Sequence, residues 1–114
     1  MRISTNVTVQ PAATGSVICL PKEVLQAAGW DITTEKPFFV YKVNDRCLAC
    51  SQVATPKANW SLFTTLIPDR HLFNNRMSQA PTFRVSVKRE LGANKGEKLL
   101  VRVNPNDSTI YIYR

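Results

Sequence analysis

Apolar and polar positions divide this chain into short strand-like and helix-like stretches that occur twice in the same order. Residues 16–20 form a brief apolar run, which predicts a strand. Pro21 follows and suits the first turn of a helix over 22–28, because its missing N–H would be unpaired there anyway. Gly29 then predicts a left-handed end to that helix.

A hairpin is predicted after this helix. Residues 38–43 are rich in aromatic and β-branched strand formers, and residues 47–52 are typical of a returning strand. The segment 44–46 between them supplies the turn. The first copy is therefore strand, short helix, Gly, strand, turn and strand.

The last third of the chain repeats this order with a shorter helix. The predicted elements are a strand at 82–87, a helical turn at 88–91 stopped by Gly92, and strands at 98–103 and 109–113 around a turn at 104–108. An internal repeat decides an architecture more than any single residue does. We therefore divide the chain into a first half at 1–52, a connector at 53–80 and a second half at 81–114, which together form one intertwined domain.

The connector has a less regular pattern. Residues 60–67 suit either a strand or a buried helix, and residues 68–74 could begin with a helical turn. The whole stretch is too long and too apolar for a bare flexible loop, so we expect it to have some structure.

The segment Leu20–Trp30, with the sequence Leu-Pro-Lys-Glu-Val-Leu-Gln-Ala-Ala-Gly-Trp, resembles the signature of the AbrB/SpoVT/MazE superfamily. In that signature a strand runs into an apolar residue, Pro, a basic residue and Glu, followed by a short helix and Gly. The second half resembles other parts of the same family signature. Arg84–Leu91 is similar to its basic residue, strand and helix start, and Gly92–Leu99 to its glycine loop, although Lys88 stands where the family has proline.

This resemblance implies a mainly β fold with short helices, the AbrB-like swapped-hairpin β-barrel. In the family two chains interlock their hairpins, because a lone half-barrel cannot cover its apolar face. With both halves in one chain we expect a monomeric pseudo-dimer, as in the two-copy MraZ-like members, and swapping between chains would instead give a homodimer. The chain lacks the MraZ-like Asp-x-x-x-Arg pattern and is not assigned to that group.

A net charge of +7 favours an acidic partner. The excess lies late in the chain, where residues 79–114 hold seven of the 15 Lys and Arg but only three of the eight Asp and Glu. Positive charge supplies the salt-dependent part of nucleic-acid affinity. The resemblance implies the same function, a DNA-binding regulator of transcription, whereas charge alone would equally suit a basic surface that is merely solvated.

We expect double-stranded DNA to be bound by a basic face. By its position in the family pattern, Arg84 is the candidate for reading base edges, where guanine offers two acceptors in a matching geometry. Val17 stands at the corresponding place in the first half, so the site should be asymmetric or weakly specific. The other candidate DNA contacts are Lys22, Lys88, Arg89, Lys95, Lys98 and Arg102.

Several other function classes find little support. No apolar stretch has the length of a membrane span and no apolar signal core follows the start, which predicts a cytoplasmic protein. Cys47 and Cys50 form a C-x-x-C, but positions i and i+3 of a strand point to opposite faces, so we expect no metal site. His71 is the single histidine, and catalytic pairs drawn with it are uninformative. We expect no enzyme activity and no cofactor.

The alternative function is binding to a protein. An antitoxin-like protein, or a viral or mobile-element inhibitor, would use the apolar connector 53–80 for this purpose. The residues that give the connector its apolar surface are Trp60, Leu62, Phe63 and Leu66.

Overall fold

The structure is a computed structural model that describes residues 3–13, 15–54, 60–68 and 81–114, together with the backbone of 72–73 and 76–77. The fold is mainly β with two short helices, as predicted. Among the described residues, the strands form open antiparallel sheets of six, three and two strands, and the swapped-hairpin barrel stays a prediction. No helix in the described part of the chain is long and apolar enough to cross a membrane.

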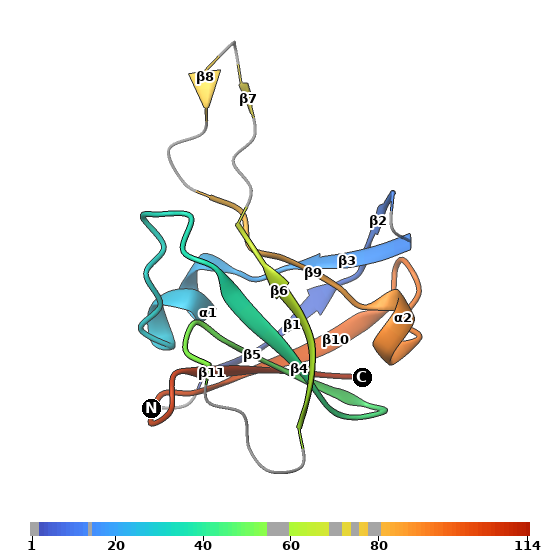
Figure 1. Ribbon diagram of the computed structural model, residues 1–114. Coiled ribbons are helices and arrows are strands. Elements are labelled where there is room, and N and C mark those ends of the chain that lie inside the picture. Colours follow the sequence, from blue (N-terminus) through green and yellow to red (C-terminus); the bar gives the residue numbers. More distant parts are fainter. Residues whose placement is uncertain (1–2, 14, 55–59, 69–71, 74–75, 78–80) are drawn as a thin grey trace.

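The elements follow one another along the chain as in Figure 1. They are β1 (Ser4–Thr8), β2 (Gln10–Ala12), β3 (Gly15–Cys19), α1 (Lys22–Ala27), β4 (Phe38–Asn44), β5 (Cys47–Ser51), β6 (Ser61–Leu66), β7 (Leu72–Phe73), β8 (Arg76–Met77), β9 (Arg84–Ser86), α2 (Lys88–Leu91), β10 (Lys98–Asn104) and β11 (Thr109–Tyr113).

Most predicted elements are present close to their predicted bounds. The choice left open at 60–67 is resolved in favour of a strand, β6. The predictions missed β1 and β2. Of the helical turn considered at 68–74, residues 69–71 and 74 lie outside the described residues, and these include His71. Residues 72–73 form strand β7 instead, which was not predicted, nor was β8.

Both helices end as the sequence predicts. Gly29 follows α1 with φ of +73° and Gly92 follows α2 with φ of +65°, and this left-handed conformation favours glycine. The buried side of α1 is formed by Val24 and Leu25, and that of α2 by Leu91. Each helix therefore contributes one short apolar face to the core.

The two repeats share their sheets. Strand β3 pairs with β9 and β5 pairs with β11, both antiparallel, so equivalent strands lie side by side. Strand β1 pairs with β10 of the second repeat, and β6 pairs with β4 of the first. Helices α1 and α2 consequently lie at opposite ends of the β3–β9 ladder (Figure 1).

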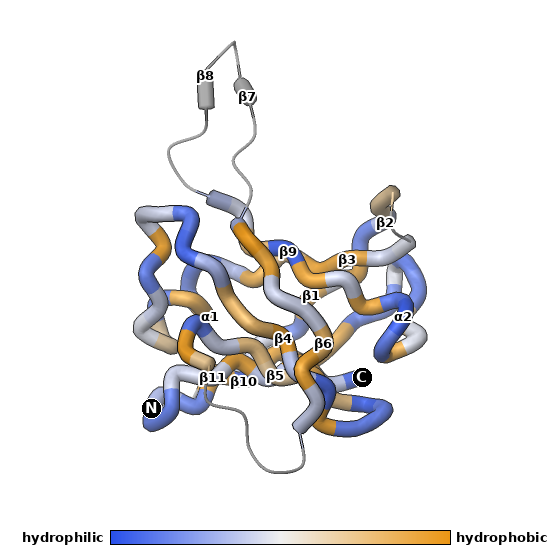
Figure 2. Tube along the Cα trace, in the orientation of Figure 1, coloured by the Kyte–Doolittle hydropathy of each residue, from blue (hydrophilic) through white to orange (hydrophobic). Residues whose placement is uncertain are grey.

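The hydrophobic core lies between the six-stranded and three-stranded sheets. Trp30, Phe38 and Phe83 meet there with ring centroids 5.5–5.9 Å apart. Residues of both sheets and both helices complete the core, including Ile18, Val24, Val85, Leu91, Leu99, Val101 and Ile112. In Figure 2 hydrophobic stretches recur along the strands, whereas the segment around α2 is mostly hydrophilic.

Candidate nucleic-acid interface

The seven cationic residues predicted to contact DNA are all exposed: Lys22, Arg84, Lys88, Arg89, Lys95, Lys98 and Arg102. The structure distributes them over three places rather than one face. One group surrounds α2, a second lies at the far end of the β3–β9 ladder, and Arg102 lies on the outer face of the six-stranded sheet.

The largest group belongs to residues 88–98, which comprise α2, the loop 92–97 and the first residue of β10; we name this segment the basic lobe. It contains Lys88, Arg89, Lys95 and Lys98 within eleven consecutive residues. Lys88 donates a hydrogen bond to the side-chain oxygen of Asn94 in the same lobe. The positive charge of the second half is therefore concentrated on one short segment.

The two carboxylates of the basic lobe are engaged by cations from other elements. Glu90, whose side chain is 15% exposed, lies 3.8 Å from Lys42 of β4 and 3.9 Å from Arg89 of the lobe itself. Lys42 also lies 3.2 Å from Asp45. Arg114 lies 2.9 Å from Glu97, whose side chain is 28% exposed. The acidic groups of the lobe are thus largely covered, and its exposed charges are those of its lysines and Arg89.

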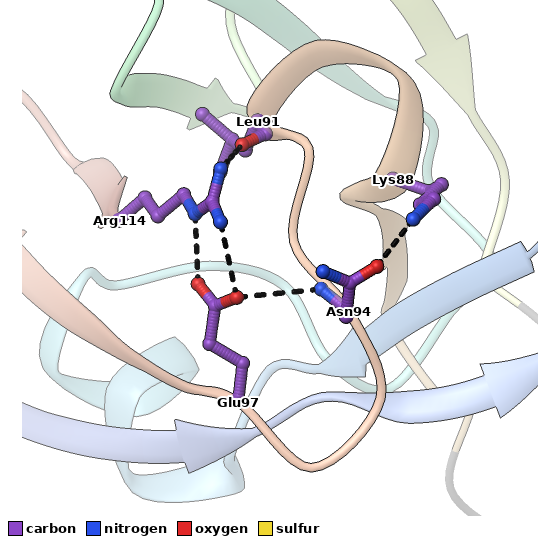
Figure 3. Close-up of polar contacts among 5 residues, drawn as sticks. All are labelled: Lys88, Leu91, Asn94, Glu97 and Arg114. Carbon is purple, nitrogen blue, oxygen red and sulfur yellow. Dashed lines mark hydrogen bonds and ion pairs between the residues drawn. The ribbon is translucent and has the colours of Figure 1, made fainter.

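Arg114 holds the lobe together from the end of β11 (Figure 3). Its Nε donates to Glu97 Oε2 at 2.9 Å, its Nη2 to Glu97 Oε1 at 3.3 Å, and its Nη1 to the Leu91 carbonyl at 2.8 Å. A planar guanidinium that bonds a carboxylate twice fixes the geometry of both partners. The hydrogen bonds from Arg114 lower the pKa of Glu97, so the carboxylate stays charged at neutral pH.

Backbone contacts fasten the lobe to the first strands of the chain. The N–H of Gly96 donates to the Val9 carbonyl at 2.9 Å, and the N–H of Val9 donates to the Glu97 carbonyl at 2.8 Å. At Gly15 a Cβ atom would lie 3.3 Å from Cβ and Cγ of Lys88, so the Lys88 stem packs directly on this glycine. The lobe is therefore positioned before any ligand arrives.

The second group lies at the opposite end of the β3–β9 ladder. Arg84 is the register partner of Cys19, the last residue of β3, whereas Lys88 packs on Gly15, its first residue. Four residues of extended strand separate these points by about 13 Å. Lys22, at the start of α1, borders a small depression together with Pro81 and Phe83, the residue that precedes Arg84 in the chain.

Arg102 lies apart from both groups. It is in β10, where its register partners are Ser4 of β1 and Tyr111 of β11. Its neighbours Val101 and Val103 are buried in the core, so Arg102 points away from the core and from the three-stranded sheet. We do not expect one DNA duplex to contact Arg102 and Arg84 at the same time.

The C-x-x-C residues point to different surroundings, as strand geometry predicts. Cys50 belongs to the hydrophobic core, whereas Cys47 pairs with Tyr113 on the other side of the sheet. Burial raises the pKa of the Cys47 thiol to about 11 and that of Cys50 further still. Within the described ranges, no three His, Cys, Asp or Glu side chains gather as metal ligands would.

Thiol modification should follow this burial. Cys19 is exposed while Cys47 and Cys50 are buried with raised pKa values, so only Cys19 should react with a maleimide at roughly pH 8. Mass spectrometry should count one modified thiol in the folded protein and three after denaturation. The Cys19→Ser variant is the control and should not react while folded. Rapid modification of Cys47 in the folded chain would show that this thiol is not buried.

No family model, curated protein or solved structure matches this chain. The likeness to the AbrB/SpoVT/MazE superfamily therefore rests on its sequence motifs alone.

Proposed function

We propose that the protein binds duplex DNA and regulates transcription, with the basic lobe as its main contact. Lys22 and Arg84 extend this contact along the β3–β9 ladder. The observation that supports the proposal most is that both carboxylates of the lobe are paired with cations. Both of its carboxylates are partly covered and lie beside cations, Glu97 beside Arg114 and Glu90 beside Lys42 and Arg89, so the most exposed charges of the lobe are positive.

The lobe residues have distinct roles in this proposal. Lysines such as Lys95 and Lys98 bind phosphates as mobile point charges, which gives affinity without sequence preference. Arg84 is the residue that would read base edges, because a guanidinium matches the paired acceptors of guanine. The two halves differ at these places, so an asymmetric or weakly specific site is expected.

A salt series tests the proposal. Fluorescence anisotropy with a labelled random duplex should show a steep fall in log affinity as log salt rises. Each phosphate contact contributes about 0.9 to that slope, so Lys88→Ala/Lys95→Ala should reduce its magnitude by roughly 2. The control Lys36→Ala removes an exposed cation from the loop between α1 and β4 and should leave the slope nearly unchanged.

Two outcomes would overturn DNA binding by the lobe. One is no detectable binding at roughly 50 mM salt, where phosphate contacts are strong. The other is that Lys36→Ala changes the slope as much as the single variant Lys88→Ala or Lys95→Ala does. That result would mean that the net charge of the protein binds DNA without a defined site.

The protein-binding alternative also has an observation in its favour. In the described part of the chain, the exposed large hydrophobic residues are Val53, Leu62 and Ile67, with 54–63% of their surface accessible. All three lie in the connector 53–80. If the duplex experiment fails, a protein partner for this apolar surface becomes the leading hypothesis.

A further inference from the structure

A row of five aromatic side chains crosses the outer face of the six-stranded sheet; we name it the aromatic row. Its members are Phe39, Tyr41, Trp60, Tyr111 and Tyr113. Successive ring centroids along the row are 6.5, 5.9, 5.9 and 6.2 Å apart. None of the five belongs to the hydrophobic core between the sheets. The row is therefore a separate feature of the surface.

Strand register explains why the row forms. Ala49 of β5 is paired with Tyr41 of β4 on one side and with Tyr111 of β11 on the other. Paired residues of antiparallel strands point to the same face, so the small Ala49 leaves a hollow between two tyrosines. Trp60 fills it, since its ring lies 5.9 Å from each of theirs.

Much of the row remains accessible. Tyr41 is buried beneath its neighbours, but Phe39, Trp60, Tyr111 and Tyr113 keep part of their surface exposed. Tyr111 and Tyr113 stack with an interplanar angle of 25°. Burial raises the pKa of Tyr111, so its phenol is neutral and does not repel an anion at physiological pH. The row thus offers flat, uncharged ring surface to a ligand.

Two arginines flank this ring surface. Arg102 lines a depression with Tyr111 and Tyr113, and Arg46 lines an adjoining one with the same two rings. Neither guanidinium has a hydrogen bond or ion pair to another described residue. No Asp or Glu is among the described residues that line either depression.

Asp107 is the carboxylate whose charge acts on the row, and it already accepts hydrogen bonds from neighbouring residues. After burial, the charge of Asp107 is the next cause that raises the pKa of Tyr111, but the Asp107 oxygens accept hydrogen bonds from the Thr109 N–H and the Asn104 side chain. Asp107 therefore helps to form the turn before β11. Arg114 also lines the second depression, but its guanidinium is held by Glu97 and the Leu91 carbonyl. Arg46 and Arg102 are therefore the described charges that border the rings without a partner.

We propose that the aromatic row binds single-stranded nucleic acid. Bases would stack on Trp60, Tyr111 and Tyr113, while Arg102 and Arg46 bind the phosphates. Half-exposed rings beside unpaired arginines suit a ligand that has both flat faces and negative charge. A duplex hides its base faces, so this ligand differs from the one proposed for the basic lobe. The two sites use different residues.

The experiment uses a labelled oligothymidine of about 12 nucleotides and measures its anisotropy with the full chain. Tyr113→Leu keeps apolar bulk but removes a ring, and we expect it to bind the oligonucleotide roughly 5- to 100-fold more weakly. Arg102→Gln should weaken binding and reduce the salt slope. Binding should also quench Trp60 fluorescence, whereas Trp30 is buried in the core.

Duplex binding by the same variants separates this proposal from the one above. Tyr113→Leu should leave duplex affinity unchanged, and Lys95→Ala should weaken duplex binding while leaving oligothymidine binding nearly intact. The proposal is overturned if the folded Tyr113→Leu and Arg102→Gln variants bind oligothymidine as the parent does. It is also overturned if no oligothymidine binds at low salt. A thermal melt shows whether each variant is folded. If Tyr113→Leu does not fold, Trp60→Leu provides a second variant that lacks one ring of the row.

Discussion

Replacing Phe83 by Ala should remove about 3–5 kcal/mol from the free energy of unfolding. Phe83 is 1% exposed and lies 5.6 Å from the ring of Phe38 and 5.9 Å from that of Trp30. The deletion forfeits both the transfer of a large ring out of water and the contacts of the two remaining rings. Since a domain of this size has about 5–15 kcal/mol in total, the loss is a large part of its stability.

Urea unfolding followed by circular dichroism measures this effect. Leu62→Ala is the control, because Leu62 is 58% exposed and its truncation should change the free energy by no more than about 0.5 kcal/mol. If Phe83→Ala and Leu62→Ala were equally mild, the three rings would not be the centre of the core. An unchanged m value in both variants would show that unfolding still exposes the same amount of surface, so that the difference lies in stability.

Period and turn chemistry were sufficient to predict the elements of the two repeats. The run before Pro21 and the alternation of 98–103 both mark strands whose inner side chains are buried. Glycines at 29 and 92 mark helix ends because those positions have positive φ. These signals are local, so they can be recognised without knowing which strands pair.

Strand β1 was missed because its pattern is faint. It is an edge strand whose one pairing in the described part of the chain is with β10, and its residues alternate between exposed and half-buried instead of exposed and buried. Such a strand has little apolar signal of its own. Strand β6 was ambiguous for a related reason: only its pairing with β4 decides between strand and helix.

The candidate sites show the same limit. The sequence predicted exposed cations, but it placed Arg102 and Arg84 on one face, and the two lie on different sheets. It also missed Arg114, which organises the basic lobe from the end of the chain. The alternation of Tyr111 and Tyr113 with two isoleucines was visible, and it signals aromatic side chains facing away from a core.

Two repeats that share sheets need not share a function. The equivalent lysines, Lys22 and Lys88, lie at opposite ends of the β3–β9 ladder, yet only Lys88 is part of a basic lobe. Helix α1 has six residues and α2 has four, so the second repeat presents its cations from a tighter turn. The common architecture supplies stability, and divergence around α2 supplies the surface proposed to bind DNA.

Gly15→Ala should reduce the free energy of unfolding by about 2–4 kcal/mol and also weaken duplex binding. Gly15 has φ of +113°, a conformation that costs an L-residue roughly 1–3 kcal/mol. The new Cβ would also lie 3.3 Å from Cβ and Cγ of Lys88, tighter than an ordinary contact. To relieve that contact, α2 must shift against β3, and the shift would displace the exposed lysines of the basic lobe.

Gly96→Ala is the matched control for this effect. Gly96 also has positive φ, +87°, but a Cβ there meets no atom within 4 Å. The two variants therefore share backbone strain and differ in the contact with Lys88, so Gly15→Ala should be the less stable by roughly 1 kcal/mol in urea unfolding. Truncating Lys88 as well, in Gly15→Ala/Lys88→Ala, should recover part of that difference in the free energy of unfolding. A double-mutant cycle measures this coupling. Equal stability of the two alanine variants would mean that Lys88 does not pack on Gly15, and that the hairpin between β2 and β3 does not position the basic lobe.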